Sequence, residues 1–112
     1  MIAGSGNIVH NLGKLRWDLL GKSEPAAPQA IQFDADFVSW LQSRDMESLS
    51  SWQSHPDAKY AAPTPEHLIP ALIIAGAQDP DDELNLITRG NDGYSVTMTS
   101  FAFKPKAKNE DL

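Results

Sequence analysis

Pro-Thr-Pro-Glu-His-Leu-Ile-Pro, residues 63–70, is the most informative stretch of this 112-residue chain. Thr64 is a good helix cap, and Pro65 fits the first helical position, where the N–H that it lacks would have no partner. An apolar run follows, and Gly76 is a plausible end of the helix. The pattern therefore predicts a helix with His67 in its first turn, where the positive helix end disfavours a charged imidazole. A neutral imidazole near pH 7 is what a metal ligand requires. The alternative is a partly buried, hydrogen-bonded histidine.

A second histidine follows a glycine turn. Gly-Ser-Gly-Asn, residues 4–7, is typical of a tight turn, and the apolar spacing of residues 10–20 predicts an amphipathic helix. His10 would then lie where a glycine turn enters a helix, a common place for catalytic side chains in α/β folds. The glycines are not a dinucleotide fingerprint, because no third glycine follows at the required spacing.

Three stretches occur together in one order: Ser-Gly-Asn-Ile-Val-His-Asn-Leu (5–12), Pro-Thr-Pro-Glu-His-Leu-Ile-Pro (63–70) and Ser-Val-Thr-Met-Thr-Ser-Phe-Ala-Phe (95–103). In that order they resemble the C-terminal half of the class III extradiol ring-cleavage dioxygenases. This is the LigB-type superfamily, and the DOPA 4,5-dioxygenase-like branch is the most similar. The resemblance implies an α/β fold, the C-terminal part of a mixed sheet with flanking helices. It also divides the chain into a C-terminal portion of the catalytic domain, residues 1–104, and a flexible tail, residues 105–112.

The resemblance implies an activity and specific roles. Members of this family hold one divalent metal, normally Fe(II) and in some cases zinc. They open a catechol ring with O2 beside a hydroxyl-bearing carbon. His67 corresponds to the last of three metal-binding histidines, and His10 to the catalytic histidine that faces substrate and oxygen and works as an acid and base. Many relatives carry a further histidine just before the Pro-Thr motif, where this chain has Ala62.

The other two metal-binding histidines of the family come from its N-terminal half. We expect these 112 residues to lack them, because the only other histidine is His55. Its surroundings, Gln-Ser-His-Pro-Asp (53–57), predict an exposed loop rather than a metal ligand. A ferrous site of this class needs three protein ligands, so we expect the chain alone to hold an incomplete site.

Three interpretations stay open. The chain is an extradiol dioxygenase that acts with a complementary N-terminal half or as a homo-oligomer. Alternatively, it is a catalytically inactive truncated fragment or interaction subunit that keeps the fold. The third interpretation is a zinc hydrolase that uses His10, His55 and His67. It is the weakest, because zinc ligands must converge on one point and nothing in the spacing brings His55 to the other two.

The composition limits the class of protein. A hydrophobic content of 41% with 21% charged residues is ordinary for one globular domain. The formal net charge of −6 argues against nucleic acid as a partner. The absence of cysteine excludes disulfides and thiolate metal sites. No targeting segment is visible, and the longest nearly apolar run, residues 68–77, is about half of the ~20 residues that cross a bilayer. We therefore expect a cytoplasmic protein without a membrane partner, acting on a catechol-type small molecule and O2.

The rest of the pattern predicts short helices. Residues 21–32 read as a Pro/Ala linker, and Asp34 can cap a helix that carries Phe37 and Leu41. Asp45 can cap a second, shorter helix. Residues 54–62 and 78–83 read as loops.

The end of the chain predicts a β-hairpin. Residues 84–88 and 94–103 read as strands, and Arg-Gly-Asn-Asp-Gly (89–93) between them has turn chemistry. On the second strand, alternation puts one set of side chains on a common face: Ser95, Thr97, Thr99, Phe101 and Phe103. We expect Phe101 and Phe103 to belong to the core.

Overall fold

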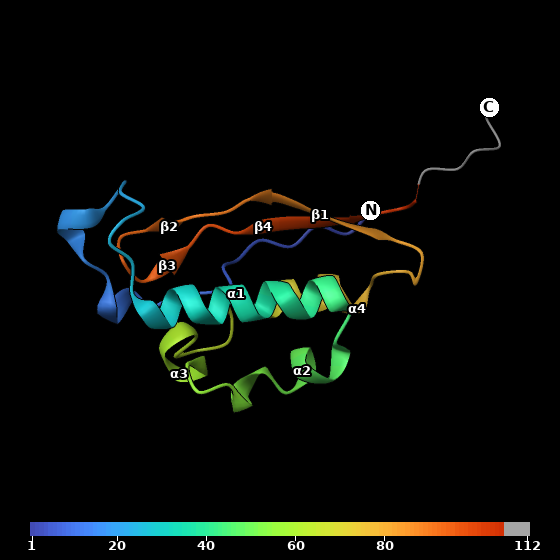
Figure 1. The fold of residues 1–112 in the computed structure, drawn as a ribbon, viewed down its shortest axis with the longest axis horizontal. Coiled ribbons are helices and arrows are strands. Elements are labelled where there is room, and N and C mark those ends of the chain that lie inside the picture. The colour runs from blue at the N-terminus through green and yellow to red at the C-terminus, as the bar shows by residue number, and fades with distance from the viewer. Residues whose placement is uncertain (107–112) are drawn as a thin grey trace.

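The computed structural model describes residues 1–106, so most of the predicted tail lies outside the described residues. The elements in chain order are η1 (Leu12–Lys14), η2 (Trp17–Leu19), α1 (Pro28–Ser43), α2 (Met46–Ser50), η3 (Trp52–Ser54), α3 (Ala58–Ala61), α4 (Ile69–Gly76), β1 (Glu83–Thr88), β2 (Asn91–Asp92), β3 (Val96–Thr97) and β4 (Ser100–Lys104). Figure 1 shows α1 running across the molecule, with the strands along one side of it and α2 and α3 along the other. The predicted α/β class is confirmed.

Helix α1 is held in place by one continuous apolar face. Its buried apolar residues recur at spacings of about three or four: Ala30, Phe33, Phe37, Val38 and Leu41. Pro28 lies in the first turn, where its missing N–H costs nothing, and Arg44 ends the helix in the left-handed region with φ 56°. The rings of Phe33 and Trp52 meet edge to face with centroids 6.4 Å apart. This contact packs α1 against the segment that contains η3.

The predicted hairpin is confirmed, and all the strand pairs of the described residues are antiparallel. β1 pairs with β4, with Asn85 opposite Ala102, and the register shifts between Leu86 and Thr88. β2 pairs with β3 across a turn at residues 93–95. The turn therefore comes later than the predicted 89–93, because residues 91–92 belong to β2 and the turn begins at Gly93, whose φ is 62°. The single second strand predicted over 94–103 is divided into β3 and β4.

The predicted alternation along this second strand is also confirmed. Ser95 and Thr97 are buried, and Thr99 is 9% exposed. Phe101 and Phe103 pack against the buried core. This face of the hairpin therefore looks towards α1, and Thr99 donates a hydrogen bond of 2.9 Å from its hydroxyl to the α1 carboxylate of Asp34.

Residues 7–11 join the hairpin to the helical part, and the chain bends at residues 8 and 9. His10 forms an antiparallel bridge with Val96. The Thr97 N–H donates to the Val9 carbonyl at 3.1 Å, and on the other side the His10 N–H donates to the Ala61 carbonyl at 2.8 Å. The segment is thus bonded on both sides, which fixes the backbone of His10.

The helix predicted for residues 10–20 is wrong. The chain forms the two three-residue elements η1 and η2 there, and Leu15 between them is extended with ψ 136°. The Arg16 N–H donates to the Gly93 carbonyl at 2.9 Å, and the Asn11 side chain accepts from the Lys14 N–H at 3.2 Å. These contacts use the donors that an α-helix would need, so His10 lies at an isolated β-bridge rather than at the start of an α-helix.

Two predicted helix starts are displaced. α1 begins at Pro28, so the end of the predicted linker is helical and Asp34 is buried inside the helix instead of capping it. α4 begins at Ile69. A proline inside a helix clashes with the carbonyl four residues earlier, and the later start leaves Pro70 in the first turn, where this clash does not arise. His67 consequently lies in the turn that precedes α4, and the helix ends at Gly76 as predicted.

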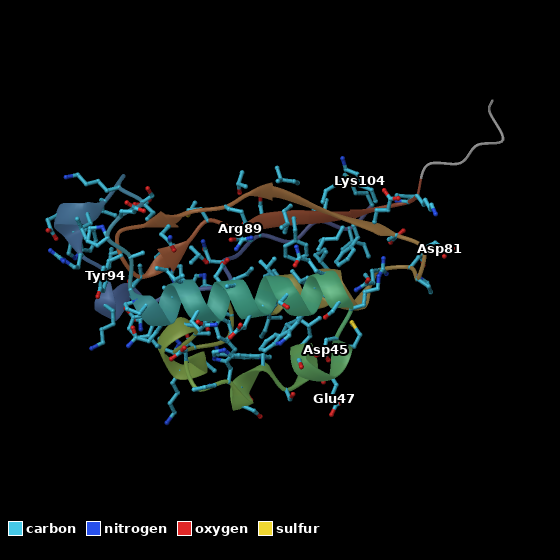
Figure 2. The ribbon with its side chains drawn as sticks, viewed as in Figure 1. Asp45, Glu47, Asp81, Arg89, Tyr94 and Lys104 are labelled. Carbon is cyan, nitrogen blue, oxygen red and sulfur yellow. The ribbon has the colours of Figure 1, made fainter. Side chains whose placement is uncertain are left out.

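The predicted start of α2 is confirmed. Asp45 precedes the helix, and its carboxylate accepts a hydrogen bond of 3.0 Å from the Ser48 N–H. Figure 2 shows Asp45 and Glu47 together at this short helix, which the capping bond closes. Within the described residues, none of the helices reaches the length and apolarity that a bilayer crossing requires.

Candidate functional site

The structure brings the two predicted site histidines into contact. The imidazole rings of His10 and His67 are stacked, with centroids 3.6 Å apart and planes inclined by 21°. His67 keeps 42% of its side chain exposed, so its ring is accessible from solvent. Residues 57 positions apart in sequence thus form one pair at the surface.

Backbone hydrogen bonds hold both histidines in place. The segment before His10 is tied to the turn that carries His67, because the Asn7 N–H donates to the His67 carbonyl at 2.7 Å. Gly6 permits this approach, since a Cβ at that position would lie 2.1 Å from the same carbonyl oxygen. On the other side of His10, the Asn11 amide donates to the Tyr60 carbonyl at 2.8 Å. The tight turn predicted for residues 4–7 is wrong, because the chain does not turn there and neither of its glycines has a positive φ. Gly6 instead serves the pair by letting two backbones come close.

The surroundings of the pair favour a neutral His10. Burial lowers the pKa of His10 most, and the nearby His67 lowers it further. The Glu66 carboxylate acts in the opposite direction on the His10 pKa. Since the ordinary pKa of histidine is about 6.5, a lowered value leaves the His10 imidazole uncharged near pH 7. Such a ring can accept a proton from a bound substrate.

Glu66 is a neighbour of the pair that the sequence analysis did not single out. Its carboxylate lies 3.9 Å from the Nε2 atom of His67. The Thr64 hydroxyl donates a 2.7 Å hydrogen bond to this carboxylate, and that bond is the main cause of the lowered pKa of Glu66. Glu66 lies within the motif of residues 63–70. Its contact with Thr64 was not predicted, because Thr64 was expected to cap the helix.

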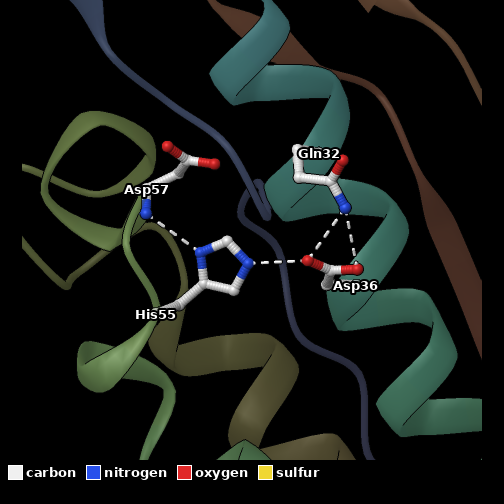
Figure 3. Close-up of polar contacts among 4 residues, drawn as sticks. All are labelled: Gln32, Asp36, His55 and Asp57. Carbon is white, nitrogen blue, oxygen red and sulfur yellow. Dashed lines mark hydrogen bonds and ion pairs between the residues drawn. The ribbon is translucent and has the colours of Figure 1, made fainter.

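His55 does not join the pair. It was predicted in an exposed loop, yet its side chain is only 8% exposed. Figure 3 shows the ring between two elements: its Nε2 atom meets the Asp36 carboxylate of α1 at 2.7 Å, and its Nδ1 atom accepts from the Asp57 N–H at 3.0 Å. Both ring nitrogens are therefore engaged, and neither is free to bind zinc. This geometry speaks against the hydrolase interpretation.

The metal that the resemblance implies needs more ligands than this site offers. Among residues 1–106, no group of three or more His, Cys, Asp or Glu side chains is arranged to hold a metal ion. The His10–His67 pair therefore does not by itself fit a three-ligand ferrous centre. A three-ligand metal centre at His67 would need ligands from outside the described residues.

Comparison with known proteins identifies distant relatives of the chain. No protein-family model matches the chain. The 4,5-DOPA dioxygenase extradiol of Escherichia coli (strain K12) is 28% identical to it over 100 residues. The resemblance to the extradiol dioxygenases is confirmed. The aligned region covers 89% of this chain and 37% of the curated extradiol dioxygenase, so the chain spans well under half of that relative.

A solved structure has the same fold. The crystal structure of an uncharacterized protein from Escherichia coli K12 superposes on this chain with a TM-score of 0.76 and 28% sequence identity. The superposition covers 87% of this chain and 40% of that protein. The chain is thus a distant relative of an extradiol dioxygenase, with the fold of one part of a longer protein.

Proposed function

We propose that this chain contributes part of an extradiol ring-cleavage site, in which His10 is the acid and base and His67 is one metal ligand. The contact between the two imidazoles, 3.6 Å between centroids, carries the proposal. Sequence alone predicted a role for each histidine separately, and a shared site requires that they meet. The distant similarity to 4,5-DOPA dioxygenase extradiol supports the class of reaction, an oxidation that opens an aromatic ring.

His10 has the properties that proton transfer requires. Burial and the neighbouring His67 lower its pKa, so the ring is neutral near pH 7 and can accept a proton from a catechol hydroxyl. The same ring can return the proton when the aromatic ring opens. Its backbone is bonded to Ala61 and lies beside β3, and this fixed backbone supports a role that requires a constant position beside His67.

The metal enters this proposal as Fe(II), with zinc as the alternative, and His67 is the residue of this chain that would hold it. When bound, the metal would bring catechol and O2 together. In this proposal its other ligands come from outside the described residues, from a complementary N-terminal half or a second copy of the chain. The described residues offer no three-ligand group of their own.

The two roles can be tested separately by one substitution each. The protein for this test is the chain combined with the polypeptide that supplies the other metal ligands, called the reassembled protein. His67→Gln should abolish iron binding, measured as iron per chain after desalting. His10→Gln should keep the iron and lower kcat by roughly 10²- to 10⁴-fold, the range for loss of a general acid or base. Loss of iron from the His10 variant would make His10 a ligand instead. Full iron occupancy in the His67 variant would contradict the assignment of His67.

The second candidate function is an inactive interaction subunit that keeps the fold. The lack of a three-ligand group among residues 1–106 favours it. The same reassembled protein distinguishes the two functions, because an inactive subunit would bind its complementary polypeptide without gaining iron or ring-cleavage activity.

A further inference from the structure

A large groove opens beside the segment that precedes His10, and neither His10 nor His67 lines it. Its volume is about 840 Å³, and four parts of the chain line it: the N-terminal residues, α4, the loop after α4 (residues 77–82) and β4. Apolar side chains from the N-terminal residues, α4 and β4 reach the groove, among them Ile2, Ala71, Ile74 and Phe101. Ile2 is 64% exposed, which is unusual for a large aliphatic residue beside other apolar groups.

The groove begins where antiparallel pairing stops. The N-terminal segment pairs with β3 through the bridge between His10 and Val96. Continued in this register, the pairing would bring residues 2–6 opposite residues 100–104. Instead, within the described part of the chain, the backbone of residues 2–6 forms no hydrogen bond with other backbone groups. The edge of β4 that faces away from β1 also lacks a strand partner among these residues.

Two glycines explain why the segment separates from β4. A Cβ at Gly6 would lie 2.1 Å from the His67 carbonyl oxygen, and a Cβ at Gly4 would lie 3.1 Å from the Pro70 Cβ. The segment therefore lies against α4 at distances that favour glycine, and this contact keeps it away from β4. The result is two unpaired backbone edges on either side of one apolar space.

We propose that this groove receives one extended β-strand from the part of an extradiol dioxygenase that has no counterpart in these residues. The inference rests on the proposed function, in which the missing metal ligands also come from that part. Unpaired backbone edges favour a strand over a helix, because only a strand can satisfy the N–H and C=O groups of both edges. The solved relative, of which this chain matches 40%, contains the additional polypeptide. Alternate residues of the strand should be apolar where they face Ile74 and Phe101.

Hydrogen exchange tests the proposal without metal or catalysis. The 112-residue chain would be co-expressed with the remainder of the Escherichia coli 4,5-DOPA dioxygenase extradiol, the part outside the matched region, as a separate polypeptide. In the complex, the amides of residues 2–6 and the outward-facing amides of residues 100–104 should exchange at least about tenfold more slowly than in the chain alone.

A matched pair of substitutions locates the contact. Ile2 lines the groove and is 64% exposed, whereas Ile87 of β1 is 63% exposed and does not line it. Ile2→Asp should weaken binding of the added polypeptide by at least about tenfold, because it puts a charge into an apolar contact. Ile87→Asp should leave binding unchanged. Since both side chains are exposed in the chain alone, both variants should fold.

Several results would overturn the proposal. These are no binding to the unaltered chain, binding with unchanged exchange at residues 2–6, and equal weakening by both variants. Slow exchange at residues 2–6 in the chain alone would also overturn it. If the chain is then a monomer, slow exchange would mean that residues 2–6 close onto β4. If the chain is a dimer, it would mean that a second copy of the chain occupies the groove. Exchange could still slow in the groove if His10 and His67 did not have the proposed roles. The two proposals can therefore fail separately.

Discussion

Gly6 allows the two backbone segments of the candidate site to lie close together. Its neighbour Asn7 donates to the His67 carbonyl at 2.7 Å, and a Cβ at Gly6 would lie 2.1 Å from that oxygen. Gly6→Ala must therefore push the segment and the turn apart. We expect the free energy of unfolding to fall by about 1–3 kcal/mol, the usual cost of overpacking. Urea denaturation followed by circular dichroism measures the change.

Gly76 provides the control for this substitution. It is the last residue of α4, and no atom lies within 4 Å of a Cβ built there. Gly76→Ala should raise the free energy of unfolding by up to about 1 kcal/mol, because alanine favours a helix over glycine. Equal stability of the two variants would mean that the contact between Gly6 and His67 does not hold the segment.

The hydrogen bond between Asp36 and His55 should make the stability of the fold depend on pH. The hydrogen bond from the His55 ring is the largest cause of the lowered pKa of Asp36, and that from the Gln32 amide is the next. A carboxylate with a lowered folded-state pKa stabilises the fold above its unfolded value of about 3.9, and this contribution is lost as the pH falls through the folded value. We therefore expect Asp36→Asn to lose less stability than the unaltered chain as the pH falls below about 4.

Urea denaturation at a series of acid pH values checks this expectation. Gln32→Leu serves as a graded comparison, because it removes the second donor and leaves the larger contribution of His55 to the pKa of Asp36. Its slope of stability against pH should lie between those of the unaltered chain and Asp36→Asn. Identical slopes for all three proteins would show that Asp36 does not gain from these bonds in the folded state.

At the scale of elements, the sequence predicted best where a local signal decides the structure. Asp45 caps α2 through the Ser48 N–H, as expected of an aspartate before a short helix. The hairpin and its alternation were also predictable, because Ser95 and Thr97 are buried as the two-residue period requires. The start of α1 was placed too late, since its first turns are set by packing of Ala30 rather than by a polar cap.

The segment around His10 shows why other elements could not be predicted. The spacing of leucines in residues 10–20 suits a helix, but long-range bonds decide the structure there. Asn11 is bonded to Ser95 and Arg16 to Gly93, each across most of the chain. The residues of the candidate site could be named from their motifs, whereas the stacking of His10 on His67 and the burial of His55 depend on tertiary contacts that no local pattern contains.

At the scale of the whole molecule, the number of available ligands sets what the chain can do by itself. Residues 1–106 contain no three-ligand metal group, and a metal held by one imidazole exchanges readily with water. We expect the purified 112-residue chain to retain well below one iron per chain after desalting and to form no ring-opened product from a catechol. Elemental analysis and absorbance of the semialdehyde product measure both. Robust product from the chain with Fe(II) would contradict this and direct attention to a site shared by two copies.

The pairing of the first residues with the last strands also determines when the site can form. The Asn7 amide bonds the Thr97 carbonyl across 90 positions, and the Val9 N–H bonds the Thr97 hydroxyl across 88. At a synthesis rate of ~5–20 residues per second, the N-terminal segment waits roughly 5–20 s for its partner strand to be made. His10 is thus translated well before β3, and its segment is fixed only after β3 has been made. A nascent chain that stops before β3 would contain both histidines of the candidate site and still lack the strand that orders His10.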